Sequence, residues 1–350
     1  MAIVEPVAEP GVLTSQVARL FFQSQLTKVE IARRLGMSRF RVARMIDEAL
    51  TAGLVEIHFR DTMALEPELA RALELRFGLD LCVVAKAAST SGADRLELAR
   101  VASLVLADLL RQDEVLGVAW GSTIAGLAAS MVPHQAPAVR VVQLSGGSMR
   151  IARDENPSEV ARRLADRLGA AYHPLYAPAF VESVDLRDAL VREPDLRETI
   201  ALFDRITLAV VGIGAYGTGS SGEHRSALIA SGVLGPEDVR MMREEGAVGD
   251  LILYPFALDG RFVAASVASR AVAIAVEQLR RVPRVMAVAG GAPKADAIRG
   301  ALATGIVKIL VTDEHAARAI LSEPTGGQDR VKRGAALPRV RAKTRSARHD

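Results

Sequence analysis

The chain has 350 residues, of which half are hydrophobic, and a formal net charge of only +3. This length predicts two or three domains, and the hydrophobic content is enough for a substantial core. The lone Cys82 excludes an internal disulfide, and the sequence shows neither an apolar run of membrane-spanning length nor a secretory signal pattern, so we expect a cytoplasmic protein.

Near the N-terminus the sequence predicts two short helices, a tight turn and a strand. The first helix covers 28–35, Gly36 suits the turn, and Ser38 suits the N-cap of a second helix over 39–51. Four apolar side chains of this second helix are expected to point inward: Val42, Ala43, Ile46 and Leu50. The alternating run 54–59 predicts the strand.

Together with a supporting helix predicted over 13–25, this order is typical of a winged helix-turn-helix, so residues 1–61 are expected to form a DNA-binding domain. The candidate DNA contacts are Thr27, Ser38, Arg39, Arg41, Val42 and Arg44. Arg39 and Arg41 are expected at base edges and Ser38 at a phosphate, because such helices present their N-terminal residues to the major groove. A helical hairpin with a solvated basic face is the alternative.

Residues 62–80 predict a linker helix with an apolar stripe. Leu65, Leu69, Leu73 and Phe77 follow one another at four-residue steps. The stripe fits either a linker that packs on its own domain or a seam that joins two protomers.

From residue 81 to residue 322, runs rich in Val and Ile alternate with amphipathic segments. This alternation predicts a doubly wound, largely parallel α/β domain with helices on both faces of the sheet. The predicted strands are 81–84, 115–120, 139–144, 172–175, 206–213, 251–256, 285–289 and 309–312. The predicted helices are 94–110, a segment from about 124, 158–168, 195–202, 272–279 and 294–304. Residues 323–350, rich in Pro, Gly and Arg, predict a disordered basic tail.

Small or glycine-rich loops follow four of the predicted strands, where ligands bind in doubly wound sheets. The candidate ligand-binding residues are Gly121, Ser122, Thr123, Gly146, Gly147, Gly212, Gly214, Asp250, Gly291 and Lys294. Backbone amides at a helix start, together with hydroxyls or a lysine, suit an anion such as phosphate. For each loop a tight turn is the alternative, and for Asp250 an ordinary turn or capping acid.

Other chemistries lack support in the sequence. Residues 212–217 match GxGxxG, but no helix follows promptly and no acidic residue ends a second strand, which argues against a dinucleotide site. The six histidines show no metal-ligand spacing, and no GxSxG elbow is present. We therefore expect no cofactor, no metal site and no catalytic residues.

Over residues 13–321 the chain resembles the SorC family of bacterial sugar-binding transcriptional regulators, also called the deoxyribonucleoside-regulator-like family. The stretches that carry the resemblance are Gly246-Ala247-Val248-Gly249-Asp250, the run from Ala289 to Leu321, Trp120-Gly121-Ser122-Thr123 and the leucine-rich linker. The resemblance implies a helix-turn-helix joined to an effector domain similar to sugar-phosphate isomerases and deaminases. It also implies a phosphorylated sugar as effector and a tetrameric assembly.

The resemblance also implies roles for single residues. Gly121, Ser122 and Thr123 match a phosphate-binding loop, and Gly291 and Lys294 match a second anion-contacting element. Asp250 matches an acid that contacts sugar hydroxyls, and Arg225 matches a basic ligand contact that some members have. The chain departs from the family pattern at two positions. Ser145 stands where many relatives have arginine, and Ala257 stands where many have aspartate. The first departure leaves a monophosphate or an unphosphorylated polyol as alternatives to a doubly phosphorylated ligand.

The sequence therefore predicts a DNA-binding transcriptional regulator of a carbohydrate or polyol catabolic operon. Its expected partners are double-stranded operator DNA, a sugar or sugar-phosphate effector, and further copies of itself in a dimer or tetramer. One rival is an isomerase- or deaminase-like enzyme with an appended DNA module, although an enzyme needs an acid/base pair and Asp250 has no obvious partner in sequence. The other is a constitutive DNA-binding or architectural protein, which would not need ligand loops.

Overall fold

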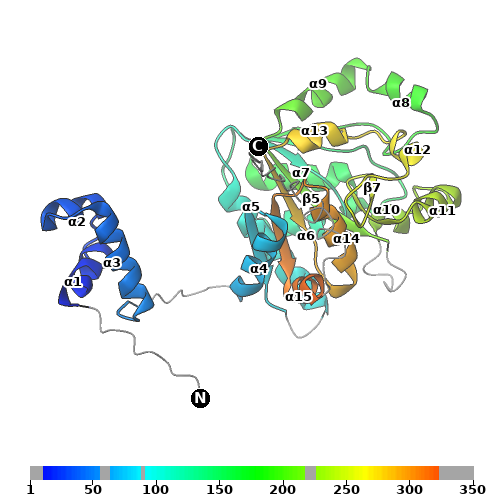
Figure 1. The fold of residues 1–350 in the computed structure, drawn as a ribbon. Helices are drawn as coiled ribbons and strands as arrows, with labels where there is room; N and C mark the ends of the chain where they lie inside the picture. The colour runs from blue at the N-terminus through cyan, green and yellow to red at the C-terminus, as the bar shows by residue number, and fades with distance from the viewer. Residues whose placement is uncertain (1–10, 56–63, 88–90, 217–225, 323–350) are drawn as a thin grey trace, which may run out of the picture. The chain divides into compact units, whose positions relative to one another are not determined.

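The computed structural model describes residues 11–55, 64–87, 91–216 and 226–322. The chain divides into two compact units, residues 1–62 and residues 63–350 (Figure 1). Residues 56–59 of the predicted strand and the predicted tail, 323–350, lie outside the described residues. In the described part, no helix combines the length and the apolar character needed to cross a membrane.

The first unit contains three helices: α1 (Val12–Phe22), α2 (Lys28–Leu35) and α3 (Arg39–Thr51). They pack around a small apolar core of Val17, Leu20, Ile31, Ala32, Val42, Met45 and Ile46. The boundaries of α2 and α3 confirm the predicted helix-turn-helix. Gly36, with φ of +63°, ends α2 in the left-handed conformation that glycine adopts without a steric penalty.

Side chains cap both helices of this motif. Thr27 Oγ1 accepts a hydrogen bond from the Glu30 N–H, and the Thr27 N–H donates to the Glu30 carboxylate, which forms a capping box. Ser38 Oγ accepts from the Arg41 N–H at 3.2 Å and caps α3 as predicted. Leu50 was wrongly expected to point inward: its side chain is 38% exposed, whereas Met45 and Ala49 are buried.

The second unit is built on a parallel sheet in the order β1-β9-β8-β5-β2-β3-β4. The strands are β1 (Leu81–Ala85), β2 (Val115–Val118), β3 (Arg140–Gln143), β4 (Ala171–His173), β5 (Leu208–Ala215), β8 (Arg284–Val288) and β9 (Ile309–Asp313). An antiparallel hairpin of β6 (Ala247–Leu251) and β7 (Tyr254–Ala257) pairs with the end of β5. The expectation of one strand over 251–256 was therefore wrong, because the chain reverses at Ile252, whose φ is +64°.

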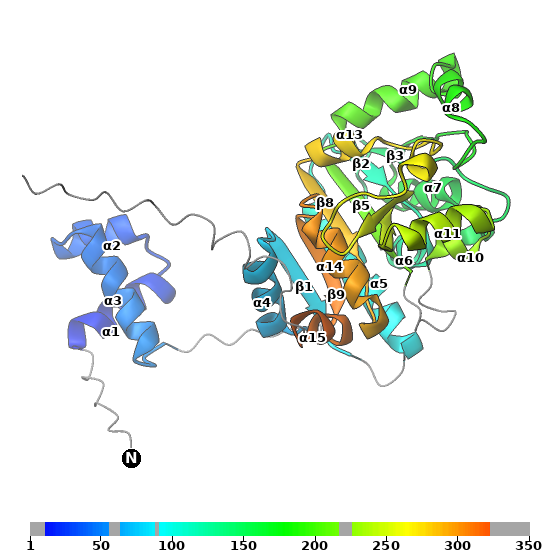
Figure 2. The ribbon, with the colours of Figure 1, turned by 45° about the vertical axis from the view of Figure 1, so that its right-hand side comes forward.

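Helices cover both faces of this sheet, which confirms the predicted α/β class (Figure 2). One core contains side chains from α5 (Ser91–Leu109), α6 (Ser122–Ser130) and α7 (Pro157–Leu168). The other contains side chains from α4 (Pro67–Phe77), α9 (Pro194–Leu202), α10 (Ala227–Ala230), α11 (Pro236–Glu244), α12 (Ala265–Ala268), α13 (Val276–Arg281), α14 (Ala295–Ala303) and α15 (Glu314–Ser322). The other helical segments within the described residues are α8 (Val184–Leu190) and the 3-10 turns Arg153–Glu155, Phe203–Arg205 and Ala292–Lys294.

The linker helix α4 packs on its own unit, which resolves the two alternatives left by its apolar stripe. Leu73 is fully buried, Leu69 packs against the same core, and Leu65 forms a β-bridge with Ala85. The Arg76 guanidinium donates hydrogen bonds to the carbonyls of Ile320 and Leu321 at the end of α15. The idea of an exposed leucine stripe that joins protomers is therefore wrong, because this domain already covers the stripe.

Candidate functional site

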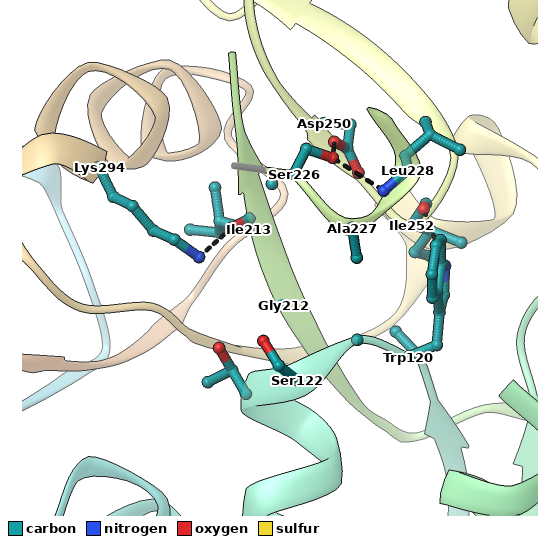
Figure 3. A pocket seen from close by; sticks show the side chains of 14 residues that line it. Trp120, Ser122, Gly212, Ile213, Ser226, Ala227, Leu228, Asp250, Ile252 and Lys294 are labelled. Atoms are coloured by element: carbon teal, nitrogen blue, oxygen red, sulfur yellow. Dashed lines mark hydrogen bonds between the residues drawn. The ribbon is translucent and has the colours of Figure 1, made fainter. Parts of the chain in front are cut away.

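A pocket lies at the point where the strand order reverses. The chain runs from β2 outward through β3 and β4, and from β5 outward in the other direction through β8 and β9. The connections after β2 and β5 therefore leave toward opposite sides and open a crevice at the carboxyl ends of these two strands. The pocket has an empty volume of about 520 Å³, including open solvent, and is lined by Ala119, Trp120, Gly121, Ser122, Thr123, Gly212, Ile213, Gly214, Ser226, Ala227, Leu228, Asp250, Ile252 and Lys294 (Figure 3).

The start of α6 forms one wall of the pocket. Gly121 has φ of +100° and ψ of 168°, a backbone region that is essentially reserved for glycine, and it lets the chain turn sharply from β2 into the helix. No side chain caps α6. Unpaired amides at a helix start attract anions, and the Ser122 and Thr123 side chains add hydroxyls on the same wall.

A buried carboxyl group, Asp250, lies on another wall. It sits on β6 directly opposite Gly214 of β5, and a Cβ atom at Gly214 would come within 2.0 Å of Asp250 Oδ1. The Ser226 hydroxyl donates to Asp250 Oδ1 at 2.6 Å. Burial raises the pKa of Asp250 from 3.8 to about 6, although Ser226, the nearby Tyr216 hydroxyl and the charge of Lys294 oppose this rise.

Lys294 brings the opposite charge to the same pocket. It ends the 3-10 turn that precedes α14, and its Nζ donates to the Ile213 carbonyl at 3.0 Å. Burial lowers the pKa of Lys294, and the Asp250 carboxylate opposes that shift. In Figure 3, Lys294 and Asp250 approach the end of β5 from different elements, with Ser122 at the start of α6. The arrangement offers a cation for an anionic group and a carboxylate that accepts hydrogen bonds from hydroxyls.

Seven of the ten predicted ligand residues line this pocket, and three do not. Gly146 and Gly147 donate their N–H groups to the carbonyls of Val272 and Ala177, and Gly291 donates to the Asp313 carboxylate at 2.6 Å. The structure therefore does not support these three as ligand contacts, because protein acceptors already use their amides. At Gly146 the absence of a side chain serves packing, since a Cβ atom would come within 2.3 Å of the Pro178 carbonyl oxygen. Arg225 lies outside the described residues.

Ser226 also lines the pocket but was not singled out from the sequence, and Trp120 was named there only as part of a motif. Ser226 belongs to no motif, and its contact with Asp250 exists only because the β6–β7 hairpin folds back on β5. The Trp120 indole N–H donates to the Ile252 carbonyl at 3.2 Å, which ties β2 to the turn of that hairpin. In the described ranges, no three His, Cys, Asp or Glu side chains gather as metal ligands.

The first unit presents the predicted DNA-reading helix, with one correction. Arg39, Arg41 and Arg44 are exposed on α3, and Arg44 forms an ion pair with Glu48 at 3.3 Å. Thr27 and Ser38 are also exposed and serve as helix caps. Val42 was wrongly included among the DNA contacts, because its side chain is fully buried in the core of the unit.

Comparisons with known proteins give matches that extend over both units. A protein family described as "Putative sugar-binding domain" matches residues 62–322. The erythritol catabolism regulatory protein EryD of Brucella abortus is 28% identical over 316 residues, which cover 90% of this chain and 98% of that protein. The deoxyribonucleoside regulator of Bacillus subtilis is 25% identical, covering 89% and 97% of the two chains. The full-length sorbitol operon regulator SorC of Klebsiella pneumoniae has the same fold, with a TM-score of 0.67 at 23% identity over 89% of this chain and 98% of that one.

Proposed function

The chain belongs to the SorC family of sugar-binding transcriptional regulators, and from this premise we propose that it controls a carbohydrate or polyol catabolic operon in response to an effector bound between β2 and β5. It is a regulator rather than an enzyme, as the relatives' names indicate. Because a regulator acts where the DNA is, we propose a cytoplasmic location.

The observation that carries the pocket assignment is the presence of Lys294, Asp250 and the uncapped start of α6 around one pocket at the strand-order reversal. Lys294 and the α6 amides would hold an anionic group, and Asp250 would accept hydrogen bonds from hydroxyls. This chemistry fits a small sugar or polyol phosphate. Two relatives are named for erythritol catabolism and for deoxyribonucleosides, and these names favour a small polyol or sugar.

Binding of a second phosphate group is not supported by Ser145, which stands where the family resemblance implies an arginine in many relatives. This residue is fully buried and forms a β-bridge with Ala273. Its short side chain cannot replace the reach or the charge of arginine. We therefore favour a monophosphate, with an unphosphorylated polyol as the alternative.

Ligand binding can be followed directly because Trp120, the only tryptophan of the chain, lines the pocket. Titration with linear polyol monophosphates should change Trp120 fluorescence in the wild type. Lys294→Ala should bind the same compound at least tenfold more weakly, since it loses a charge-assisted contact. Lys86→Ala is the matched control, because Lys86 is an exposed lysine paired with Glu66 outside the pocket. Equal affinity of the wild type and Lys294→Ala would show that the pocket is misplaced.

The regulatory step is measured as operator binding by fluorescence anisotropy. Without effector, Lys294→Ala should bind operator like the wild type, because the substitution is remote from α3 in sequence and lies in the other unit. With effector, the wild type should change its operator affinity by roughly 5- to 150-fold, which is typical of allosteric coupling, and Lys294→Ala should not respond. Asp250→Asn should respond more weakly than the wild type but more strongly than Lys294→Ala, since it keeps an oxygen acceptor. Turnover of a sugar phosphate would instead favour the enzyme alternative.

We further propose that the protein acts as a dimer or tetramer. A single helix-turn-helix offers a small DNA interface, and operators of this class are usually read by symmetric oligomers with matching half-sites. Light scattering at micromolar concentration should therefore give a mass above the 37.3 kDa of one chain, and a monomer with and without DNA would contradict the proposal.

A further inference from the structure

The recognition helix α3 presents an aromatic side chain, Phe40, at the centre of its exposed face. The buried residues Val42, Met45, Ile46 and Ala49 define the inward face of this helix. With a rotation of 100° per residue, Phe40 points almost directly away from that face, and Arg44 follows it one turn later. The Phe40 side chain is 73% exposed, although it is among the most hydrophobic of the side chains.

Two basic residues flank Phe40 in the sequence. Arg39 and Arg41 precede and follow Phe40 in the first turn, and both are exposed. The Arg39 guanidinium carbon lies 4.9 Å from the centre of the Phe40 ring, a cation–π arrangement that restrains both side chains. The first turn of α3 therefore combines an exposed aromatic ring with two exposed arginines, one of which contacts the ring.

Among the partners of such a surface, duplex DNA matches both properties. Its phosphates attract the arginines, and the major groove offers one apolar group at base edges, the C5-methyl of thymine. A protein partner would match the ring but would not need the neighbouring positive charge. A phosphate contact alone would not use the ring at all.

We propose that Phe40 contacts a thymine methyl group in the operator and thereby specifies that base pair, with Arg39 held against the ring. This inference rests on the proposed function, in which α3 enters the major groove. It changes the expected division of labour, because the residue at the centre of the reading face is apolar rather than one of the arginines.

The test uses the full-length protein and operator DNA from which one methyl group is removed at a time. An operator is first selected from random duplexes by the wild type, and each thymine of the selected site is then replaced in turn by uracil, which lacks only the C5-methyl. At one thymine in each half-site, uracil should weaken wild-type binding about fourfold, the effect expected for one buried methyl group. In Phe40→Ala the same replacement should have no effect, whereas replacements at other thymines should affect both proteins equally.

Val12→Ala serves as the control, because Val12 is a 90% exposed apolar residue on α1, outside the recognition helix. It should show the same uracil profile as the wild type. If Phe40→Ala binds too weakly to measure, Phe40→Leu, which keeps an apolar side chain, takes its place and should show a reduced effect at the same thymine. Identical uracil profiles in the wild type and the Phe40 variant would overturn the proposal while leaving DNA binding intact. Failure to select any sequence would instead overturn the proposed function, and this inference with it.

Discussion

The charge of Asp250 should cost folding stability, and Asp250→Asn should remove that cost. Asp250 is 5% exposed, and burial raises its pKa from 3.8 to about 6. A carboxyl group that binds its proton more tightly in the folded state favours folding at low pH. Its contribution is complete below the unfolded pKa and is lost as the pH rises through the folded pKa.

The magnitude follows from the two pKa values. A difference of about 2 pH units corresponds to roughly 3 kcal/mol. At pH 7.5 the ionised Asp250 should therefore destabilise the second unit, called the effector unit below, by up to about 3 kcal/mol. At pH 5 the same linkage relation gives a destabilisation about half as large. Asn at this position keeps an oxygen that can accept from Ser226, so Asp250→Asn should be more stable than the wild type, with a larger gain at the higher pH.

Urea unfolding followed by Trp120 fluorescence measures this effect, because the only tryptophan reports on the effector unit alone even in the full chain. Asp259→Asn is the matched control: this exposed carboxyl is hydrogen-bonded to Arg261, which lowers its pKa, so its removal should bring no gain. If Asp250→Asn were no more stable than the wild type at pH 7.5, or if its gain were the same at both pH values, the reasoning from burial would be refuted.

Three further predictions concern packing and DNA reading. Gly214→Ala should lose roughly 1–3 kcal/mol of stability and the effector response, because its Cβ would meet Asp250 Oδ1 at 2.0 Å. The control Gly212→Ala should fold normally in the same urea assay, because the nearest neighbours of a Cβ there lie at 3.6 Å. Leu73→Ala should lower the free energy of unfolding by about 2–5 kcal/mol, and Leu75→Ala, at a residue that is 75% exposed, by less than about 0.5 kcal/mol. An unchanged unfolding midpoint for Leu73→Ala would argue against the packing of α4 on its own unit. Arg41→Ala should weaken binding to a selected operator by about 1–3 kcal/mol more than binding to random DNA in anisotropy titrations, and equal losses would reduce Arg41 to a phosphate contact.

The helix-turn-helix could be predicted from sequence almost to the residue because its signals are local. Thr27 and Ser38 cap the helices that follow them, and Gly36 ends the helix before it. Each of these contacts joins residues within a few positions of one another, so the sequence pattern contains the whole interaction. The alternation of strands and helices was predictable for the same reason, because hydrophobic spacing reflects which face of each element is buried.

The composition of the pocket depended on contacts between distant parts of the chain. The loops at Gly121, Gly146 and Gly291 look alike in sequence, and only the strand order places the first beside the ligand pocket. The amides of the other two bond to Ala177, Val272 and Asp313 through pairings that no local pattern encodes.

The same holds for the charged centre of the pocket and for the linker. Asp250 reaches the pocket because β6 runs antiparallel to the end of β5, which brings it opposite Gly214 and within 2.6 Å of the Ser226 hydroxyl. The leucine stripe of α4 was correctly identified as apolar, but the surface that covers it is formed by β1 and α15, the latter more than 240 residues away along the chain. Sequence periodicity thus determined that these side chains would be buried, because burial requires only an apolar face. Tertiary structure determined which residues they pack against, because the path of the whole chain brings those residues together.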